Sequence, residues 1–275
     1  MLRGDGISVR IGDAMLLNGV TVDVIPGQVV AAMGPNGAGK STLARVLSGE
    51  LHPTVGQVTI EDRLLSAWDR VELARIRAML PQMDTLSFPF RVLDVVLLGR
   101  APHVRGAETP LDYEIVRRAL EAVAAGSLVD RIYTTLSGGE RQRVQLARVL
   151  AQIWAPPDDG SRYLLLDEPT ATLDLAHQHQ VLYLGRRLAA EGVAVFVVLH
   201  DLNLAAQYAD RLLLLKDGRV LADGSPRDVL TPETVAAVFS MESVVIDHPH
   251  GECPLVLSLP ERQPVIAMAP QKETL

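Results

Sequence analysis

The sequence predicts an α/β fold built on a parallel β-sheet with helices on both faces. Short, wholly apolar segments rich in Val and Leu recur along the chain, as is typical of strands buried on both faces of a parallel sheet. Between them, apolar residues recur every three or four positions, which is the helical spacing. This alternation is typical of parallel strands connected by helices.

The predicted elements follow in order along the chain. Residues 29–33 form an apolar segment that leads through a glycine-rich loop, residues 34–42, into a helix with Leu43, Val46 and Leu47 on one side. Further strands are predicted at residues 163–167, 194–199 and 211–215, and a short helix at residues 232–239.

Strand signals are absent between residues 82 and 162, where helical stripes replace them. One stripe runs from Ile115 to Val123, and a second helix covers residues 139–154 until Pro156 and Pro157 end it. We therefore expect a sheet-bearing core over residues 1–83 and 162–245, with a helical subdomain inserted at residues 84–161. Residues 246–275 are expected to form a C-terminal tail that is frayed from residue 260 onward.

Composition excludes several classes of protein. The 275 residues carry 26 Lys and Arg against 33 Asp and Glu, a formal net charge of -7, so a broad cationic surface for nucleic acid is not expected. No apolar run approaches the ~18 residues of a membrane-spanning helix, and no secretory signal is visible at the N-terminus. A single cysteine, Cys253, rules out an internal disulfide and is typical of a reducing compartment, so we expect the chain to stay inside the cell.

The glycine-rich loop has the pattern of a phosphate-binding loop. Its backbone N–H groups can surround phosphate oxygens, and the helix that follows offers its positive N-terminal end. Lys40 would reach the β- and γ-phosphates, and Ser41 would ligate Mg²⁺. The alternative is a plain glycine-rich turn. The loop residues are Gly34, Pro35, Asn36, Gly37, Ala38, Gly39, Lys40, Ser41 and Thr42.

Two carboxylates end the apolar strand at residues 163–167. A buried strand presents acids usefully only at its carboxyl edge, where the phosphate-binding loop also lies. Asp167 suits Mg²⁺, held directly or through water, and Glu168 is placed to orient or deprotonate an attacking water. The alternative is that both acids only cap the next turn.

A second candidate anion site begins the helix at residue 139. Ser137 and Glu140 have the spacing of a capping box, which would make the segment only a helix start. A capping box does not account for Gly138 and Gly139. These glycines would expose backbone N–H groups at a helix N-terminus, where an anion can bind. One nucleotide cannot easily use two such sites within one monomer.

Together these motifs resemble the ATP-binding subunits of ATP-binding-cassette (ABC) transporters, over about residues 6–239. Residues 136–140 resemble the family's signature motif, Gln82 its Q-loop, residues 171–174 with Asp174 its D-loop, and His200 its switch histidine. The resemblance implies a P-loop NTPase core of the RecA-like type that hydrolyses ATP with Mg²⁺ bound by Ser41, Gln82 and Asp167.

The resemblance also implies an assembly. Ser137, Gly138 and Gly139 of one subunit would close over ATP held by the loop of the other in a head-to-tail homodimer, with Asp174 beside it. Glu168, His200 and Gln82 would be the catalytic residues. The implied partners are two copies of a transmembrane permease and, indirectly, a periplasmic substrate-binding protein. No nucleic acid is implied, and the implied location is the cytoplasmic face of the bacterial inner membrane.

One segment narrows the resemblance to a branch. Residues 97–103, with Gly99, Arg100 and His103, resemble the branch of ATPases that serves importers of iron-siderophores, haem and vitamin B12. Within this branch, residues 153–162 and 173–179 look most like those of the hemin-import ATPases. For Arg100 and His103 a solvated helix end is the alternative. Two other functions remain open: a soluble ABC ATPase that acts on ribosomes or DNA, and an export or lipoprotein-extrusion ATPase.

Some residues depart from the family pattern or suggest other chemistry. Ile11 stands where the family usually places an adenine-stacking aromatic residue, and Thr172 where alanine is common. His177 and His179 are two apart on a predicted helix, so they should face different directions. The last cluster could supply three metal ligands or be a solvated loop, and consists of His248, His250 and Cys253.

Overall fold

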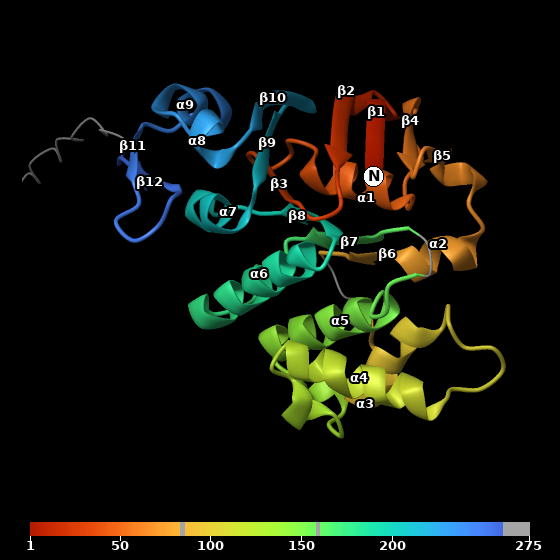
Figure 1. The fold of residues 1–275 in the computed structure, drawn as a ribbon. Coiled ribbons are helices and arrows are strands. Elements are labelled where there is room, and N and C mark those ends of the chain that lie inside the picture. Colours follow the sequence, from red (N-terminus) through yellow and green to blue (C-terminus); the bar gives the residue numbers. More distant parts are fainter. Residues whose placement is uncertain (83–85, 158–159, 261–275) are drawn as a thin grey trace, which may run out of the picture.

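The computed structural model describes residues 1–82, 86–157 and 160–260. A six-stranded sheet forms its centre, in the spatial order β10-β9-β3-β8-β7-β6 (Figure 1). All neighbours in this sheet are parallel except β10 and β9, which are antiparallel. The strands are β3 (Val29–Met33), β6 (Arg77–Leu80), β7 (Arg162–Asp167), β8 (Val193–Val198), β9 (Arg211–Lys216) and β10 (Arg219–Gly224). The predicted parallel sheet is thus confirmed.

The central strands are buried on both faces. Along β8, Ala194, Phe196 and Val198 enter one hydrophobic cluster, while Val195 and Val197 enter the other. The first cluster contains α1 (Lys40–Ser48) and an antiparallel sheet, and the second contains α5 (Gly138–Gln152), α6 (Leu175–Ala190) and α7 (Leu202–Tyr208). Apolar residues at every position, rather than at alternate ones, are what this double burial requires.

The antiparallel sheet was not predicted from the sequence. Its order is β2-β1-β4-β5, formed by β1 (Leu2–Ile11), β2 (Ala14–Val24), β4 (Val55–Ile60) and β5 (Arg63–Leu64). One face of this sheet packs on the core and the other meets solvent, so its strands mix buried and exposed residues. Such strands give no continuous apolar segment to recognise.

The helical part lies between β6 and β7 in the chain and below the sheets in Figure 1. Its helices are α3 (Val92–Leu97), α4 (Pro110–Ala122) and α5, which pack on one another. Arg100 is only 5% exposed and donates from Nε to Asp112 Oδ1 at 2.9 Å. A solvated helix end is therefore the wrong interpretation of Arg100.

The remaining elements complete the fold. The further helices are α2 (Arg70–Ile76), α8 (Pro226–Val229) and α9 (Pro232–Phe239), and a separate hairpin consists of β11 (Ser243–Asp247) and β12 (Pro254–Ser258). The hairpin crosses position 246, where we predicted that the tail begins. We predicted fraying from residue 260 onward. Residue 260 is the last one that the structure describes, so residues 261–275 of this prediction lie outside the described range. Within the described ranges, no helix is both long and apolar enough to cross a bilayer.

Candidate functional site

The loop between β3 and α1 needs glycine for steric reasons. Gly34 has φ +149°, and a Cβ there would collide with the carbonyl oxygen of Leu215. Gly39 has φ +99°, and its Cβ would lie 2.6 Å from the carbonyl oxygen of Leu16. Backbone of two other segments therefore crowds the loop, which begins α1 with its first N–H groups free of any side-chain cap.

Lys40 is the first residue of α1, and its side chain folds over the loop. Its Nζ donates to the carbonyl oxygens of Gly34 at 2.9 Å and Pro35 at 3.0 Å. Burial lowers the pKa of Lys40, and the nearby charges of Glu168 and Asp167 partly offset this shift. The ammonium group is thus held at the loop, where it can exchange these two carbonyl oxygens for phosphate oxygens.

Asp167 ends β7 and faces Ser41 across the loop. The Ser41 hydroxyl donates to Asp167 Oδ1 at 3.0 Å, and Asp167 is only 3% exposed. Burial raises the pKa of Asp167, although the hydrogen bond from Ser41 works in the opposite direction. A hydroxyl and a buried carboxylate are hard oxygen ligands, so these residues fit a cation such as Mg²⁺.

Glu168 is the meeting point of three strands. Gln82 Nε2 donates to Glu168 Oε2 at 2.8 Å, and His200 Nε2 lies 2.7 Å from Glu168 Oε1. Gln82 follows β6, Glu168 follows β7 and His200 follows β8, and these strands are neighbours in the sheet. Parallel strands end at the same edge, which explains why residues so far apart in sequence converge.

Glu168 also has an unusual backbone conformation. Its φ is +51°, in the left-handed region that residues other than glycine seldom adopt. Such conformations cost about 1–3 kcal/mol and gather at functional sites, where the surrounding structure maintains them. Nothing in the sequence around Glu168 indicated this strain.

The start of α5 forms the predicted capping box. The Ser137 hydroxyl accepts from the N–H of Glu140 at 3.3 Å, and the N–H of Ser137 donates to Glu140 Oε2 at 2.8 Å. Gly138 and Gly139 pack beside Thr172. Among the described residues, no hydrogen bond or ion pair joins Ser137, Gly138 or Gly139 to the phosphate-binding loop.

Asp174 and the paired histidines have local partners. Asp174 caps α6 by accepting from the N–H of His177 at 2.9 Å, and it also contacts His177 Nδ1 at 2.8 Å. The backbone hydrogen bond from His177 lowers the pKa of Asp174. His179 Nδ1 instead lies 2.8 Å from the Tyr208 hydroxyl. His177 and His179 thus point to different partners, as their spacing predicted.

The other singled-out residues lie elsewhere. Ile11 is 57% exposed on β1. His248, His250 and Cys253 line one cavity of about 620 Å³. Within the described part of the chain, no group of three His, Cys, Asp or Glu side chains could hold a metal ion, so the three-ligand hypothesis for this cluster is wrong.

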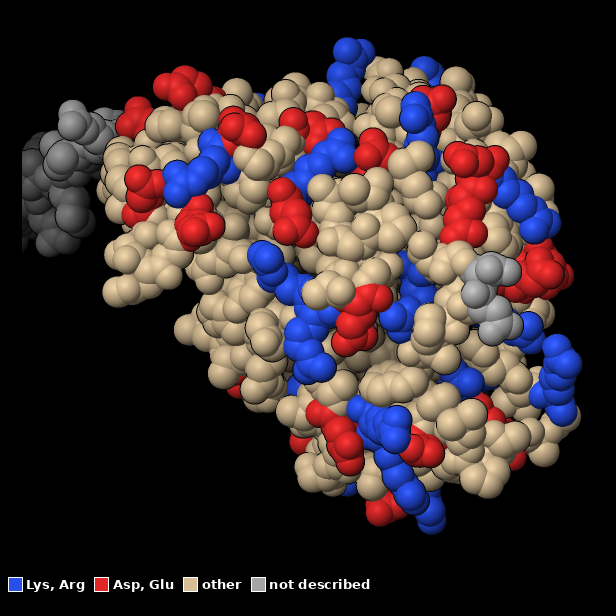
Figure 2. All heavy atoms as spheres, viewed as in Figure 1, with Lys and Arg blue, Asp and Glu red and all other residues tan. Residues whose placement is uncertain are grey.

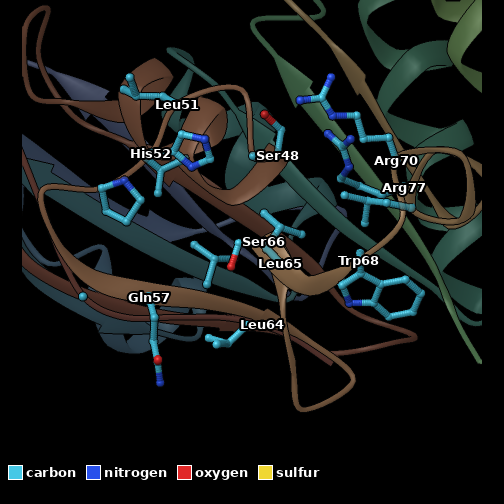
Figure 3. Close-up of a pocket in the computed structure, with 16 residues that line it drawn as sticks. Ser48, Leu51, His52, Gln57, Leu64, Leu65, Ser66, Trp68, Arg70 and Arg77 are labelled. Carbon is cyan, nitrogen blue, oxygen red and sulfur yellow. The ribbon is translucent and has the colours of Figure 1, made fainter.

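Sequence reasoning missed a cavity of about 760 Å³ between the end of α1, β4 and α2 (Figure 3). Ser48, Trp68, Arg70 and Arg77 line it together with apolar residues. Among the residues that the structure describes, the buried Trp68 Nε1 and Arg77 Nε have no hydrogen-bond partner, which is uncommon for buried donors. The lining comes from the end of α1, from β4 and from residues 64–77, which only the tertiary fold brings together, and no sequence pattern predicts it.

Comparisons with known proteins agree with this geometry. The sequence pattern of the family described as ABC transporter matches residues 17–171. The hemin import ATP-binding protein HmuV of Gloeobacter violaceus is 55% identical over 94% of this chain and 94% of its own length. The protein of the same name from Pseudomonas aeruginosa strain PAO1 is 48% identical over 94% of this chain and all of its own length.

Solved structures agree as well. An ABC transporter described as of metal-chelate type, in an inward-facing conformation, gives a TM-score of 0.78 at 28% identity, over 94% of this chain and 96% of that one. The dimeric structure of a bacterial ABC transporter cassette gives a TM-score of 0.72 at 29% identity, over 82% of this chain and 98% of that one. The chain therefore belongs to the ABC transporter family, as one of its ATP-hydrolysing subunits.

Proposed function

We propose that this chain powers the import of hemin across a membrane. The observation that carries the proposal is the 55% identity, over nearly the whole of both chains, to a protein named for hemin import. The likeness to a transporter of metal-chelate type supports the same class of cargo. Ferric siderophores and vitamin B12 are the alternative cargoes, because segment 97–103 resembles all three groups of importers.

In this proposal the residues at the carboxyl edge of the sheet divide the work of hydrolysis. The loop from Gly34 to Thr42 and Lys40 bind the phosphates of ATP, while Ser41 and Asp167, with Gln82 nearby, hold Mg²⁺. When bound there, Mg²⁺ would supply positive charge that offsets the charge developing on the phosphates. Glu168 orients the attacking water and accepts its proton, and His200 donates a hydrogen bond toward the γ-phosphate.

Two contacts of Glu168, the hydrogen bond from Gln82 and the 2.7 Å contact with His200, set its starting state. Gln82 and His200 occupy both of its carboxylate oxygens. Each carboxylate oxygen keeps a second acceptor position, so a water can bind Glu168 while these two contacts hold its side chain.

The second anion site calls for a second chain. The N-terminus of α5 with Ser137, Gly138 and Gly139 is joined to its own cap, not to the phosphate-binding loop. We propose that it closes over ATP held by another copy, in a homodimer that ATP closes and hydrolysis reopens. Solved cassettes of this fold that form dimers support this assembly.

The cavity lined by Trp68 and Arg77 is our candidate surface for the permease. Its apolar lining and the exposed Arg70 suit a helix that carries carbonyl or carboxylate oxygens. Two permease copies, one for each subunit, would hold the dimer at the cytoplasmic face of the bacterial inner membrane. The periplasmic substrate-binding protein would act on the ATPase only through them.

A role on ribosomes or DNA finds less support. Acidic and basic side chains are interspersed on the face drawn in Figure 2, and no broad basic area covers it. The formal net charge of -7 opposes binding to a phosphate backbone. We therefore propose no nucleic-acid partner.

The test is ATPase activity of this subunit with its co-purified permease in liposomes. Binding protein loaded with hemin, a ferric siderophore or cobalamin is added in turn, and empty binding protein is the control. We expect hemin alone to stimulate hydrolysis. Stimulation by another cargo would overturn the hemin assignment, and basal hydrolysis that no cargo changes would overturn the importer.

A further inference from the structure

The segment that carries His200 is held from both sides. On one side Leu199 donates its N–H to the carbonyl oxygen of Ala32 at 3.2 Å, which extends β8 into the sheet. On the other side Asp201 caps α7 by accepting from the N–H groups of Asn203 at 2.8 Å and Leu204 at 2.9 Å. His200 lies between the sheet and the first turn of α7, so the place of α7 sets its backbone.

The ring of His200 has little else to fix it. Its side chain is 44% exposed, and Glu168 is the polar partner found for it among the described residues. Its contact with Glu168, at 2.7 Å, therefore depends on where the backbone puts the ring. A small shift of α7 would change this contact directly.

One side chain fastens α7 to the C-terminal hairpin. Asn203 accepts at Oδ1 from the N–H of Val256 at 2.8 Å and donates from Nδ2 to the carbonyl oxygen of Val256 at 3.1 Å. Both backbone groups of one residue in β12 are thus paired by one amide. Val256 is 5% exposed and its side chain packs in the core, so Asn203 is bonded to a residue that is itself part of the core. Figure 1 shows the hairpin alongside α7 at the edge of the molecule.

We propose that the β11–β12 hairpin positions His200 for ATP hydrolysis, with Asn203 as the positioning residue. The side-chain hydrogen bonds of Asn203 found among the described residues go to Val256 and not to Glu168, and Asn203 lies outside every motif that identified the site. It acts through the backbone between positions 200 and 203. The hairpin, most of which lies in the predicted tail 246–275, then contributes to hydrolysis.

The test replaces Asn203 by leucine, which has a similar size and no hydrogen-bonding group. ATPase activity is measured with the subunit in complex with its permease. We expect kcat to fall about tenfold, less than the ~100-fold that a full 1 Å misplacement can cost, while KM for ATP stays within twofold. Unchanged kcat, or a rise in KM that matches the loss of kcat, would overturn the proposal.

A second comparison separates positioning from general damage. In a His200→Ala background, Asn203→Leu should lower the residual single-turnover rate by less than twofold, because the group it positions is gone. The same tenfold loss in both backgrounds would show a merely structural role and contradict the proposal.

Two further variants complete the design. Tyr208→Phe removes a hydrogen bond from the other end of α7, to His179 on α6, and should leave kcat unchanged. If Asn203→Leu does not fold, Asn203→Asp serves, since it keeps the acceptor for the Val256 N–H but turns an oxygen toward the Val256 carbonyl. It should lower kcat without changing KM, and equal activity to the parent would refute the proposal.

Discussion

The carboxyl edge of the central sheet and the start of α5 both offer groups for phosphate, yet their surroundings differ. At the sheet edge, Gln82, Glu168 and His200 follow three neighbouring strands, and Gln82 and His200 both contact Glu168. At α5, Ser137 and Glu140 bond to each other in the capping box, and Glu140 also accepts from Arg131 at 3.1 Å; among the described residues none of these contacts involves the phosphate-binding loop. The first region is a site assembled by one chain. The second is a capped helix N-terminus that lacks a phosphate-binding loop of its own chain beside it. We therefore propose that the phosphate it contacts is held by another copy, in a dimer.

The largest expected effect on turnover comes from a substitution at the sheet edge. Glu168→Gln keeps a side chain that Gln82 and His200 can still contact but removes the proton acceptor, so kcat should fall by about 100-fold or more. ATP binding should persist, and dimers should accumulate with ATP in sedimentation experiments. Glu72→Gln, on the exposed surface of α2, is the control. Turnover near that of the parent would remove Glu168 from catalysis.

Lys40→Ala tests the same region at the binding step. Loss of a charge-assisted hydrogen bond of about 1.5–3 kcal/mol should raise the Kd for ATP by roughly 10- to 100-fold. Isothermal titration calorimetry measures this value. Lys216→Ala, at the end of β9, should leave the Kd unchanged, and an equal Kd for Lys40→Ala would contradict the phosphate-binding assignment.

Gly138→Asp tests the second region alone. A Cβ at Gly138 meets only Thr172 Cβ, at 3.9 Å, and an acid in the first turn suits the helix dipole, so folding should not suffer. The carboxylate should repel the phosphate held by another copy. In a Glu168→Gln background we expect at least tenfold weaker ATP-dependent dimerisation, by sedimentation, with unchanged ATP affinity of the monomer. Undiminished dimers would refute the role of α5 in closing the site.

The smallest effect on turnover should come from the buried pair inside the helical part. Asp112→Asn leaves Arg100 buried without its counter-charge, which should lower the free energy of unfolding by about 3 kcal/mol while turnover per folded molecule stays the same. Chemical denaturation measures the loss, with Glu114→Gln on the exposed side of α4 as control.

The pH dependence of this pair has a definite sign. Burial acts to raise the pKa of Asp112, but hydrogen bonds from Thr109 and Arg100 outweigh it and hold the pKa below the usual 3.8. The stabilisation is therefore present above pH 3.8 and is lost as the pH falls through the lower value of the folded state. The difference between parent and Asp112→Asn should shrink in that acidic range, and a constant difference would argue against the ion pair.

Local patterns in the sequence determined much of this protein. The apolar strands, the glycine loop with Lys40 and Ser41, the acids at 167 and 168 and the capping box at 137 are short segments whose chemistry depends on neighbours in the chain. The motif order then identified the family. Gly34 and Gly39 illustrate the limit, since the sequence showed the glycines but not the carbonyl groups that crowd them.

Only the tertiary structure decided which residues from distant segments contact one another. Gln82, Glu168 and His200 converge because β6, β7 and β8 are parallel neighbours in the sheet, although helical segments separate them in the chain. The antiparallel sheet escaped prediction because its half-solvated strands lack continuous apolar runs. The cavity at Trp68 and Arg77, and the bond of Asn203 to Val256, join residues from separate elements. Such contacts depend on packing across the whole fold, and no local pattern carries that information.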